Sequence, residues 1–143
     1  NQRGKQRVMG HKKGASAVRE VIEEAARKEI KFLTLFTFST ENWSRPEEEV
    51  SVLMRLLLSS LKKEFNRLIK NNIQLKSIGD TSGLPALVSE ELNYVIDKTK
   101  NNTGLILTLA LNYGAKEELT QAMKTIANNI NSIFNDLRIY ILL

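Results

Sequence analysis

The spacing of apolar residues along the chain alternates between a helical and a strand-like pattern. Apolar positions three or four residues apart mark helices, and continuous apolar runs bounded by turn residues mark buried strands. The predicted strands cover residues 32–38, 73–78 and 105–111, and the predicted helices cover 18–29, 47–69, 85–96 and 115–130. Such alternation favours an α/β fold, in which helices cover both faces of a parallel central sheet.

The longest predicted helix carries an unbroken apolar stripe. Pro46 suits its first helical position, and the three acidic residues at 47–49 favour the positive end of the helix dipole. A stripe of this kind ordinarily packs against the core of the protein. Its members are Val50, Leu53, Met54, Leu57, Leu58, Leu61, Phe65, Leu68 and Ile69.

The junction between the first strand and this helix concentrates polar chemistry. Residues 38–46 read Phe-Ser-Thr-Glu-Asn-Trp-Ser-Arg-Pro and contain the only tryptophan of the chain. Junctions of this kind lie at the carboxyl ends of parallel strands, where α/β proteins bind ligands. Ordinary turns prefer small residues, so a Trp and an Arg at this place predict a site that can bind an anion.

Composition limits the class of protein. The 143 residues suffice for one domain with a sizeable core, and the apolar and charged fractions, 42% and 26%, are those of a soluble globular protein. The chain has no cysteine, which excludes disulfide and thiol chemistry and suits the cytosol. We expect no signal peptide, and the longest apolar run, residues 104–111, is too short to span a bilayer.

The net charge of +5 suits either simple solubility or an anionic partner: a diphosphate, an anionic lipid surface or a nucleic acid. Basic residues crowd the amino terminus at positions 3, 5, 7, 12 and 13. No aromatic residues lie between them, as a stacking platform for bases would need, so a nucleic-acid-binding domain is the poorer interpretation. Glycines at 4, 10 and 14 instead suit a backbone that closes on phosphate.

Several short segments, in order and in register, resemble one enzyme family. Residues 38–46 resemble the F-S-x-E-N-W-x-R-P motif of the cis-prenyltransferases, whose bacterial member is undecaprenyl diphosphate synthase. The order and spacing of the matches agree from Gly4 to about Ala127, which identifies the chain as a member of this family. The other matching residues are Gly4, Lys5, Arg7, Gly10, His11 and Gly14 upstream, and Ile-Gly-Asp at 78–80, Asn-Thr-Gly-Leu at 102–105 and Asn-Tyr-Gly at 112–114 downstream.

The resemblance implies a Rossmann-like parallel sheet, of which this chain contains only part. It also implies a transferase that condenses isopentenyl diphosphate with an allylic diphosphate, farnesyl diphosphate being the expected one. The product would be a cis-polyprenyl diphosphate, the precursor of the lipid carrier for cell-wall glycans. Further implications are Mg²⁺ as cofactor, a homodimer, no nucleic-acid partner, and a cytoplasmic location with peripheral membrane contact for product release.

Two motifs of the family are missing from residues 1–143. A D-G-N-G-R-W-A segment, which supplies a Mg²⁺-binding aspartate, would precede Asn1, and most of an R-T-x-G-E region would follow Asp136. We therefore expect no metal ligand in this chain and no activity from it alone. The alternative is a non-catalytic partner subunit of an active cis-prenyltransferase, although the intact Asn42, Trp43 and Arg45 argue against that interpretation.

The resemblance assigns roles to individual residues. Asn42 matches the position often taken for the proton acceptor; because a neutral amide is a poor base, we expect it to orient a diphosphate oxygen or a water that takes the proton. Trp43 would pack on the prenyl chain, and Glu49 would act in loop closure and at the isopentenyl diphosphate site. Contacts to the allylic diphosphate and the network around it are implied for Arg7, His11, Ser39, Thr40, Glu41 and Arg45.

Each of these residues also has an ordinary structural interpretation. Arg7 and His11, four residues apart, would share a helix face as a surface cation and a cap, and residues 39–41 would form a turn. Trp43 would be a core aromatic, Glu49 a dipole-favouring acid, and Asp80 a turn former rather than a metal ligand.

Tyr113 is a candidate for the rim of the site. Met54, Leu57 and Leu61 would either pack in the core or line a product tunnel, as this helix does in the family.

Other catalytic constellations are excluded at this stage. The sequence shows no Ser-His-Asp set, zinc-ligand spacing or Walker loop, and His11 is the only histidine, which excludes most histidine-based metal sites.

Overall fold

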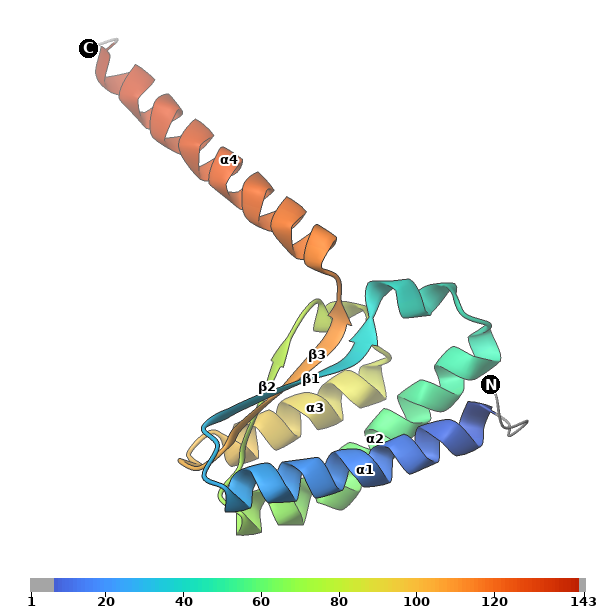
Figure 1. Cartoon of the computed structure of the whole chain (residues 1–143). Helices are drawn as coiled ribbons and strands as arrows, with labels where there is room; N and C mark the ends of the chain where they lie inside the picture. Colours follow the sequence, from blue (N-terminus) through green and yellow to red (C-terminus); the bar gives the residue numbers. More distant parts are fainter. Residues whose placement is uncertain (1–6, 142–143) are drawn as a thin grey trace.

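A parallel sheet flanked by helices forms the body of the molecule (Figure 1). The computed structural model describes the backbone of residues 7–141 and the side chains of residue 14 and of residues 16–130. All four predicted helices and three predicted strands are confirmed, with two short 3-10 helices added between them. In chain order the elements are α1 (Arg7–Arg27), β1 (Phe32–Ser39), η1 (Thr40–Ser44), α2 (Glu47–Lys70), β2 (Gln74–Ile78), η2 (Thr81–Gly83), α3 (Ala86–Thr99), β3 (Ile106–Tyr113) and α4 (Ala115–Ile141).

The three strands run parallel in the order β1-β3-β2, with Leu107 of β3 opposite both Leu33 and Leu75. Because the strands share a direction, their carboxyl ends meet at one edge of the sheet. That edge carries η1 after β1, η2 after β2 and the start of α4 after β3. Three connections distant in sequence are therefore brought together at the place where α/β proteins bind ligands.

Helices α1, α2 and α3 lie together on one side of the sheet (Figure 1). The core between them and the strands includes Leu75, Leu92, Val95 and Leu111, none more than 2% exposed. Burying one such side chain contributes about 1.5–3 kcal/mol, so this layer is the main source of stability in the described part of the chain. The apolar spacing of α3 predicts that Val88, Leu92, Val95 and Ile96 face inward. The first three are buried, and Ile96 is partly buried against the core.

The opposite face of the sheet is open in the described part of the chain. Phe32 and Phe36 of β1 are 73% and 67% exposed, so the prediction of a strand buried on both faces is wrong for β1. The physical reason is that α1, α2 and α3 all pack on the other face. The parallel α/β architecture itself is confirmed, and a second helical layer is not formed by these three helices.

Helix α4 extends away from the body (Figure 1). The apolar stripe predicted for it is present, but Leu119, Met123 and Ile126 are exposed rather than packed. The prediction that this segment is helical is therefore confirmed, whereas the prediction that its apolar side chains are buried is wrong. None of the helices in the described residues is long and apolar enough to cross a membrane.

Candidate active site

The nine-residue motif forms a 3-10 turn that closes the carboxyl end of β1. The backbone N–H of Ser39 donates to Asn42 Oδ1 at 3.2 Å, which folds the carboxamide back over the start of η1. The Ser44 hydroxyl donates to the carbonyl of Glu41 at 2.7 Å, and the N–H of Arg45 donates to the carbonyl of Asn42. These local bonds satisfy the ends of a turn too short to do so through its own ladder.

Trp43 anchors this turn to the sheet. Its ring meets the buried Phe38 edge-on, with 4.9 Å between ring centroids and 78° between the planes. Its Nε1 donates to Asn112 Oδ1, on β3, at 2.7 Å. The indole remains 39% exposed, so it packs on the core through one side and faces solvent with the other.

Asn112 joins the turn after β1 to the turn after β2. Its Oδ1 accepts from Trp43, its Nδ2 donates to the carbonyl of Asp80 at 2.9 Å, and its own carbonyl accepts from the N–H of Asp80 at 3.3 Å. The residue has φ of +47°, a left-handed conformation that Asn tolerates better than most side chains. Gly79 also needs its glycine, because φ is +97° and an added Cβ would lie 2.2 Å from the carbonyl oxygen of Leu111.

Asp80 is used as a turn former, as the ordinary interpretation predicted. Its carboxylate accepts from the N–H and the hydroxyl of Ser82, and the hydroxyl bond holds the pKa of Asp80 below its ordinary value. Tyr113, the rim candidate, donates to Glu118 Oε2 at 2.6 Å, and this bond raises the pKa of the phenol. Its ring meets Phe36 on the open face of the sheet.

Hydroxyl and carboxylate groups lie side by side at the end of β1. Ser39 is buried, and Thr40 Oγ1 is buried without a hydrogen-bond partner. Gly114 allows this close packing, because a Cβ there would lie 2.5 Å from Thr40 Oγ1. The pKa of Glu41 is held below its ordinary value, first by the backbone N–H of Glu41 itself and next by the Ser39 hydroxyl. The carboxylate is therefore ionised at neutral pH.

Arg45 lies just beyond the turn with an extended backbone, as predicted, and its side chain is 41% exposed. Its Nη1 meets Glu49 Oε1 at 2.9 Å, one turn into α2, where the Glu49 side chain is largely buried. Because the Glu49 side chain is largely buried, displacing Arg45 from it carries a desolvation cost that an incoming anion would have to offset.

An apolar cavity of about 410 Å³ lies between α1, α2 and the sheet. This volume falls in the range of about 300–1,000 Å³ typical of small-molecule sites. The predicted wall residues Met54, Leu57 and Leu61 all line it. So does Phe38, on whose ring Trp43 packs, and the cavity therefore extends to the base of the polar turn.

Two predicted site residues fall outside the described side chains. The backbones of Arg7 and His11 lie in the first turns of α1, and the structure describes nothing of their side chains. Gly10 and Gly14 lie within the same helix, and a Cβ added at Gly14 would meet no atom beyond its own stretch of helix within 4 Å. Gly10 is the fourth residue of α1, and the first four backbone N–H groups of a helix have no intrahelical acceptor. A backbone that closes on phosphate at these glycines stays a prediction.

The described residues contain no group of three or more His, Cys, Asp and Glu side chains that could hold a metal ion. Two carboxylates near the turn are already bonded, Asp80 to Ser82 and Glu49 to Arg45. This part of the chain therefore does not fit a Mg²⁺ site, and we derive no step through a metal.

Comparison with known proteins decides the family. The family model described as "Putative undecaprenyl diphosphate synthase" matches residues 1–139. The chain belongs to the cis-prenyltransferase family of undecaprenyl diphosphate synthases. It is 50% identical over 120 residues to the isoprenyl transferase of Clostridium acetobutylicum, a match that covers 84% of this chain and 47% of that protein.

Two further relatives of this cis-prenyltransferase chain are informative. It is 49% identical over 127 residues to the ditrans,polycis-undecaprenyl-diphosphate synthase ((2E,6E)-farnesyl-diphosphate specific) of Aliivibrio fischeri, covering 89% of this chain and 49% of that one. Its fold matches lavandulyl diphosphate synthase from Lavandula x intermedia in complex with dimethylallyl diphosphate, with a TM-score of 0.87 and 30% identity over 92% of this chain and 56% of that one. The chain thus spans about half the length of the curated relatives it matches.

Asn112 is the residue of this site that sequence reasoning missed. It was noted as part of a family match, but no function was given to it. An Asn at the end of a predicted strand and directly before Tyr-Gly is a signal for a left-handed residue. That signal could have placed a turn at Asn112, although not its bonds to Trp43 and Asp80.

Proposed function

We propose that the protein containing this chain condenses isopentenyl diphosphate with an allylic diphosphate and extends a cis-polyprenyl diphosphate. Farnesyl diphosphate is the proposed allylic substrate, because the Aliivibrio fischeri relative is named as specific for it. The product would serve as the precursor of the lipid carrier for cell-wall glycans. The observation that carries the proposal is the adjacency of an anion-binding polar turn and an apolar cavity of about 410 Å³, since the substrate has a charged head and a hydrocarbon tail.

The diphosphate head would bind at the polar turn. Arg45 would supply a permanent cation with fork geometry, released from Glu49 when substrate arrives. The unpartnered Thr40 hydroxyl would donate to a diphosphate oxygen, which would also complete its hydrogen bonding. Arg7 and His11 share one face of α1 by their spacing, and we assign them to the same head group.

Glu41 would act on this site indirectly. Its carboxylate is ionised at neutral pH and can only accept hydrogen bonds, so it would repel a diphosphate oxygen rather than bind it. Its bond with the Ser39 hydroxyl instead supports a role in orienting that hydroxyl. We therefore assign Ser39 and Glu41 to the network around the head group.

Asn42 would position the reacting groups. In the reaction, C1 of the allylic substrate forms a bond with C4, the terminal alkene carbon of isopentenyl diphosphate, and the C1–O bond to diphosphate breaks. Positive charge develops on C3 of isopentenyl diphosphate, and loss of a proton from C2 forms the new C2–C3 double bond. The Oδ1 of Asn42 is held by the N–H of Ser39, which directs its Nδ2 as a donor toward a diphosphate oxygen or a water. A neutral amide does not itself take the proton, so the base in this proposal is that water or the departing diphosphate.

Trp43 and α2 would receive the hydrocarbon tail. The exposed side of the indole would pack on the first part of the chain, and Met54, Leu57 and Leu61 would surround the remainder. Glu49 would hold Arg45 while the site is empty and release it as the turn closes, next to the isopentenyl diphosphate site. A dry cavity also protects a carbocation-like centre from water.

The remaining assignments concern the whole protein. We propose Mg²⁺ as the cofactor, which would neutralise the departing diphosphate with ligands supplied from outside the described residues. We also propose a homodimer located in the cytoplasm, with peripheral membrane contact when the apolar product leaves. No feature of the described residues favours the alternative of a non-catalytic partner subunit.

Incorporation of radiolabelled isopentenyl diphosphate tests the proposal. The complete protein, given farnesyl diphosphate and Mg²⁺, should form butanol-extractable polyprenyl product. Arg45→Ala should lower kcat/KM by about tenfold to hundredfold, because hydrogen bonds between charged groups contribute about 1.5–3 kcal/mol. Asn42→Ala should cost about 100-fold or more.

Arg55→Ala is the matched control, since Arg55 is an exposed cation on α2 away from the turn and should leave turnover unchanged. Absence of incorporation by the unmodified protein would refute the function. Full turnover by both Arg45→Ala and Asn42→Ala would refute the assigned roles.

A further inference from the structure

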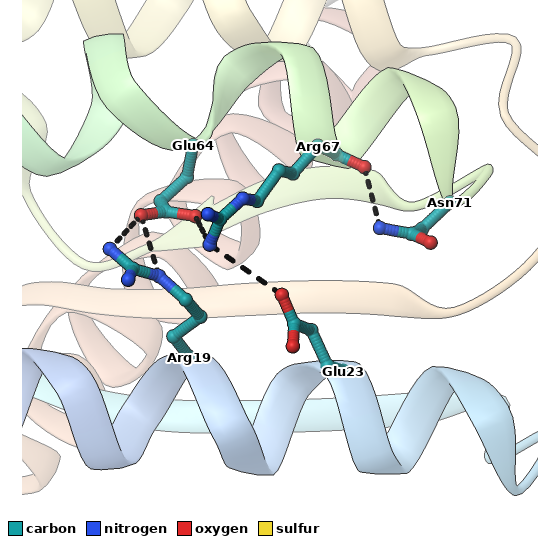
Figure 2. A network of polar contacts seen from close by, with 5 residues as sticks. All are labelled: Arg19, Glu23, Glu64, Arg67 and Asn71. Carbon is teal, nitrogen blue, oxygen red and sulfur yellow. Dashed lines mark hydrogen bonds and ion pairs between the residues drawn. The ribbon is translucent and has the colours of Figure 1, made fainter.

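Four charged residues join α1 to α2 along the wall of the apolar cavity (Figure 2). Arg19 of α1 donates from Nε and Nη2 to Glu64 Oε1 of α2, at 2.9 and 2.5 Å. One turn further along both helices, Glu23 of α1 meets Arg67 of α2 at 3.5 Å. Arg67 also meets Glu64 at 3.3 Å, so the two bridges form one network. We call these four residues the helix clasp.

The clasp lies at the end of the cavity remote from the polar turn. Glu49, which holds Arg45 at that turn, and Arg67 are roughly 27 Å apart along α2 at 1.5 Å per residue. All four clasp residues line the cavity, together with Leu68 and Asn71 at the end of α2. The cavity wall is therefore apolar at Met54, Leu57 and Leu61 and becomes charged at the far end.

This charged end opposes the advance of a hydrocarbon. Each condensation adds one isoprene unit at the diphosphate, which pushes the far end of the product deeper into the cavity. An apolar tail that reaches the clasp must displace the ion pairs or lie against them, and both cost desolvation energy that no new hydrogen bond repays. The clasp also holds α1 and α2 together, so the seam between the helices cannot open for the tail without breaking it.

We propose that the helix clasp, Arg19, Glu23, Glu64 and Arg67, terminates chain growth and thereby sets the length of the prenyl product. This inference rests on the proposed function and adds to it a specificity-determining group outside the polar turn. The clasp acts on the distribution of products rather than on the condensation step. Partly exposed ion pairs contribute little to folding, so the four residues influence product length far more than the stability of the protein.

Product length in the complete protein tests the inference. The double variant Arg19→Leu/Glu64→Leu replaces the Arg19–Glu64 ion pair by apolar side chains. Its most abundant polyprenyl product should be longer than that of the parent protein by at least one isoprene unit. Radiolabelled products, dephosphorylated and separated by reversed-phase chromatography, give this distribution. Glu64→Gln, which keeps the size of the side chain and removes only its charge, should shift the distribution in the same direction.

The chain offers a matched control in Glu24 and Arg27. This pair has the same chemistry, with bonds of 2.6 and 2.9 Å, but it lies within α1 and outside the cavity lining. Glu24→Leu with Arg27→Leu should leave product length unchanged. Unaltered product length in both Glu64→Gln and the Arg19/Glu64 variant would overturn the inference while leaving the proposed function intact.

Absence of any incorporation by the unmodified protein would overturn the proposed function itself, and the inference with it. An equal shift in the Glu24/Arg27 control would also overturn the inference, because the effect would then come from lost surface charge.

Discussion

At the scale of single residues, the chemistry of the site depends on side chains whose partners are close in sequence. Asn42 bonds the N–H of Ser39, Ser44 bonds the carbonyl of Glu41, and Arg45 meets Glu49. Such short-range bonds are why residues 39–41 could be predicted to form a turn from the sequence alone. The partner of Trp43, by contrast, is 69 residues away, and no local pattern indicates it.

The ionisation of Glu41 is the first test at this scale. An NMR titration should place its pKa below the ordinary 4.5, because its own backbone N–H and the Ser39 hydroxyl both favour the carboxylate. Ser39→Ala should raise the pKa toward that value. A carboxylate with a lowered folded-state pKa adds stability above its unfolded pKa and loses it as the pH falls through the folded one, so this contribution should fade only in acid.

Ser82→Ala is the control for this titration. It should raise the pKa of Asp80, whose carboxylate bonds Ser82, and leave that of Glu41 unchanged. A Glu41 pKa at or above 4.5 in the parent protein would contradict the assignment.

At the scale of secondary-structure elements, the sequence showed where the helices and strands lie, but it did not show which of their apolar side chains are covered. The apolar spacing predicted the four α-helices and three strands that the structure describes, because each backbone period leaves its own pattern in the sequence. It did not predict that Phe36 of β1 and Met123 of α4 would be exposed, since an apolar stripe does not say which element covers it. Ile69, assigned to the stripe of α2, is likewise 42% exposed at the end of the helix.

The link between η1 and η2 is the test at this scale. Asn112→Ala removes the bonds to Trp43 and Asp80 and places an alanine at a positive φ, so it should destabilise the protein by about 2 kcal/mol in urea unfolding. The fluorescence of Trp43 should change with it, because its indole N–H loses its acceptor.

Asn112→Gly separates the two causes. Glycine tolerates the positive φ and lacks the side chain, so the loss should be smaller, about 1 kcal/mol. If Asn112→Ala were as stable as the parent, the two turns would not be joined through this residue.

At the scale of the whole molecule, the parallel sheet brings a polar turn and an apolar cavity next to each other, and we propose that the two form one site. The carboxyl edge gathers η1, η2 and the start of α4, while α1 and α2 enclose an apolar cavity that extends from Phe38 toward the opposite end of the sheet. Family motifs allowed the polar end to be predicted. The helix clasp could not be, because it depends on which turns of α1 and α2 lie opposite each other, a property of packing rather than of either sequence segment.

Binding of a non-reactive farnesyl diphosphate analogue to the complete protein, measured by calorimetry beside inorganic pyrophosphate, tests this two-ended site most directly. Arg45→Ala should weaken both ligands by about tenfold or more, since it removes a charge-assisted contact to the shared head group. Leu57→Trp, which fills the cavity, should weaken the farnesyl analogue and leave pyrophosphate unaffected. Unchanged affinity for the farnesyl analogue in both variants would contradict the assignment of head group and tail to the polar turn and the cavity.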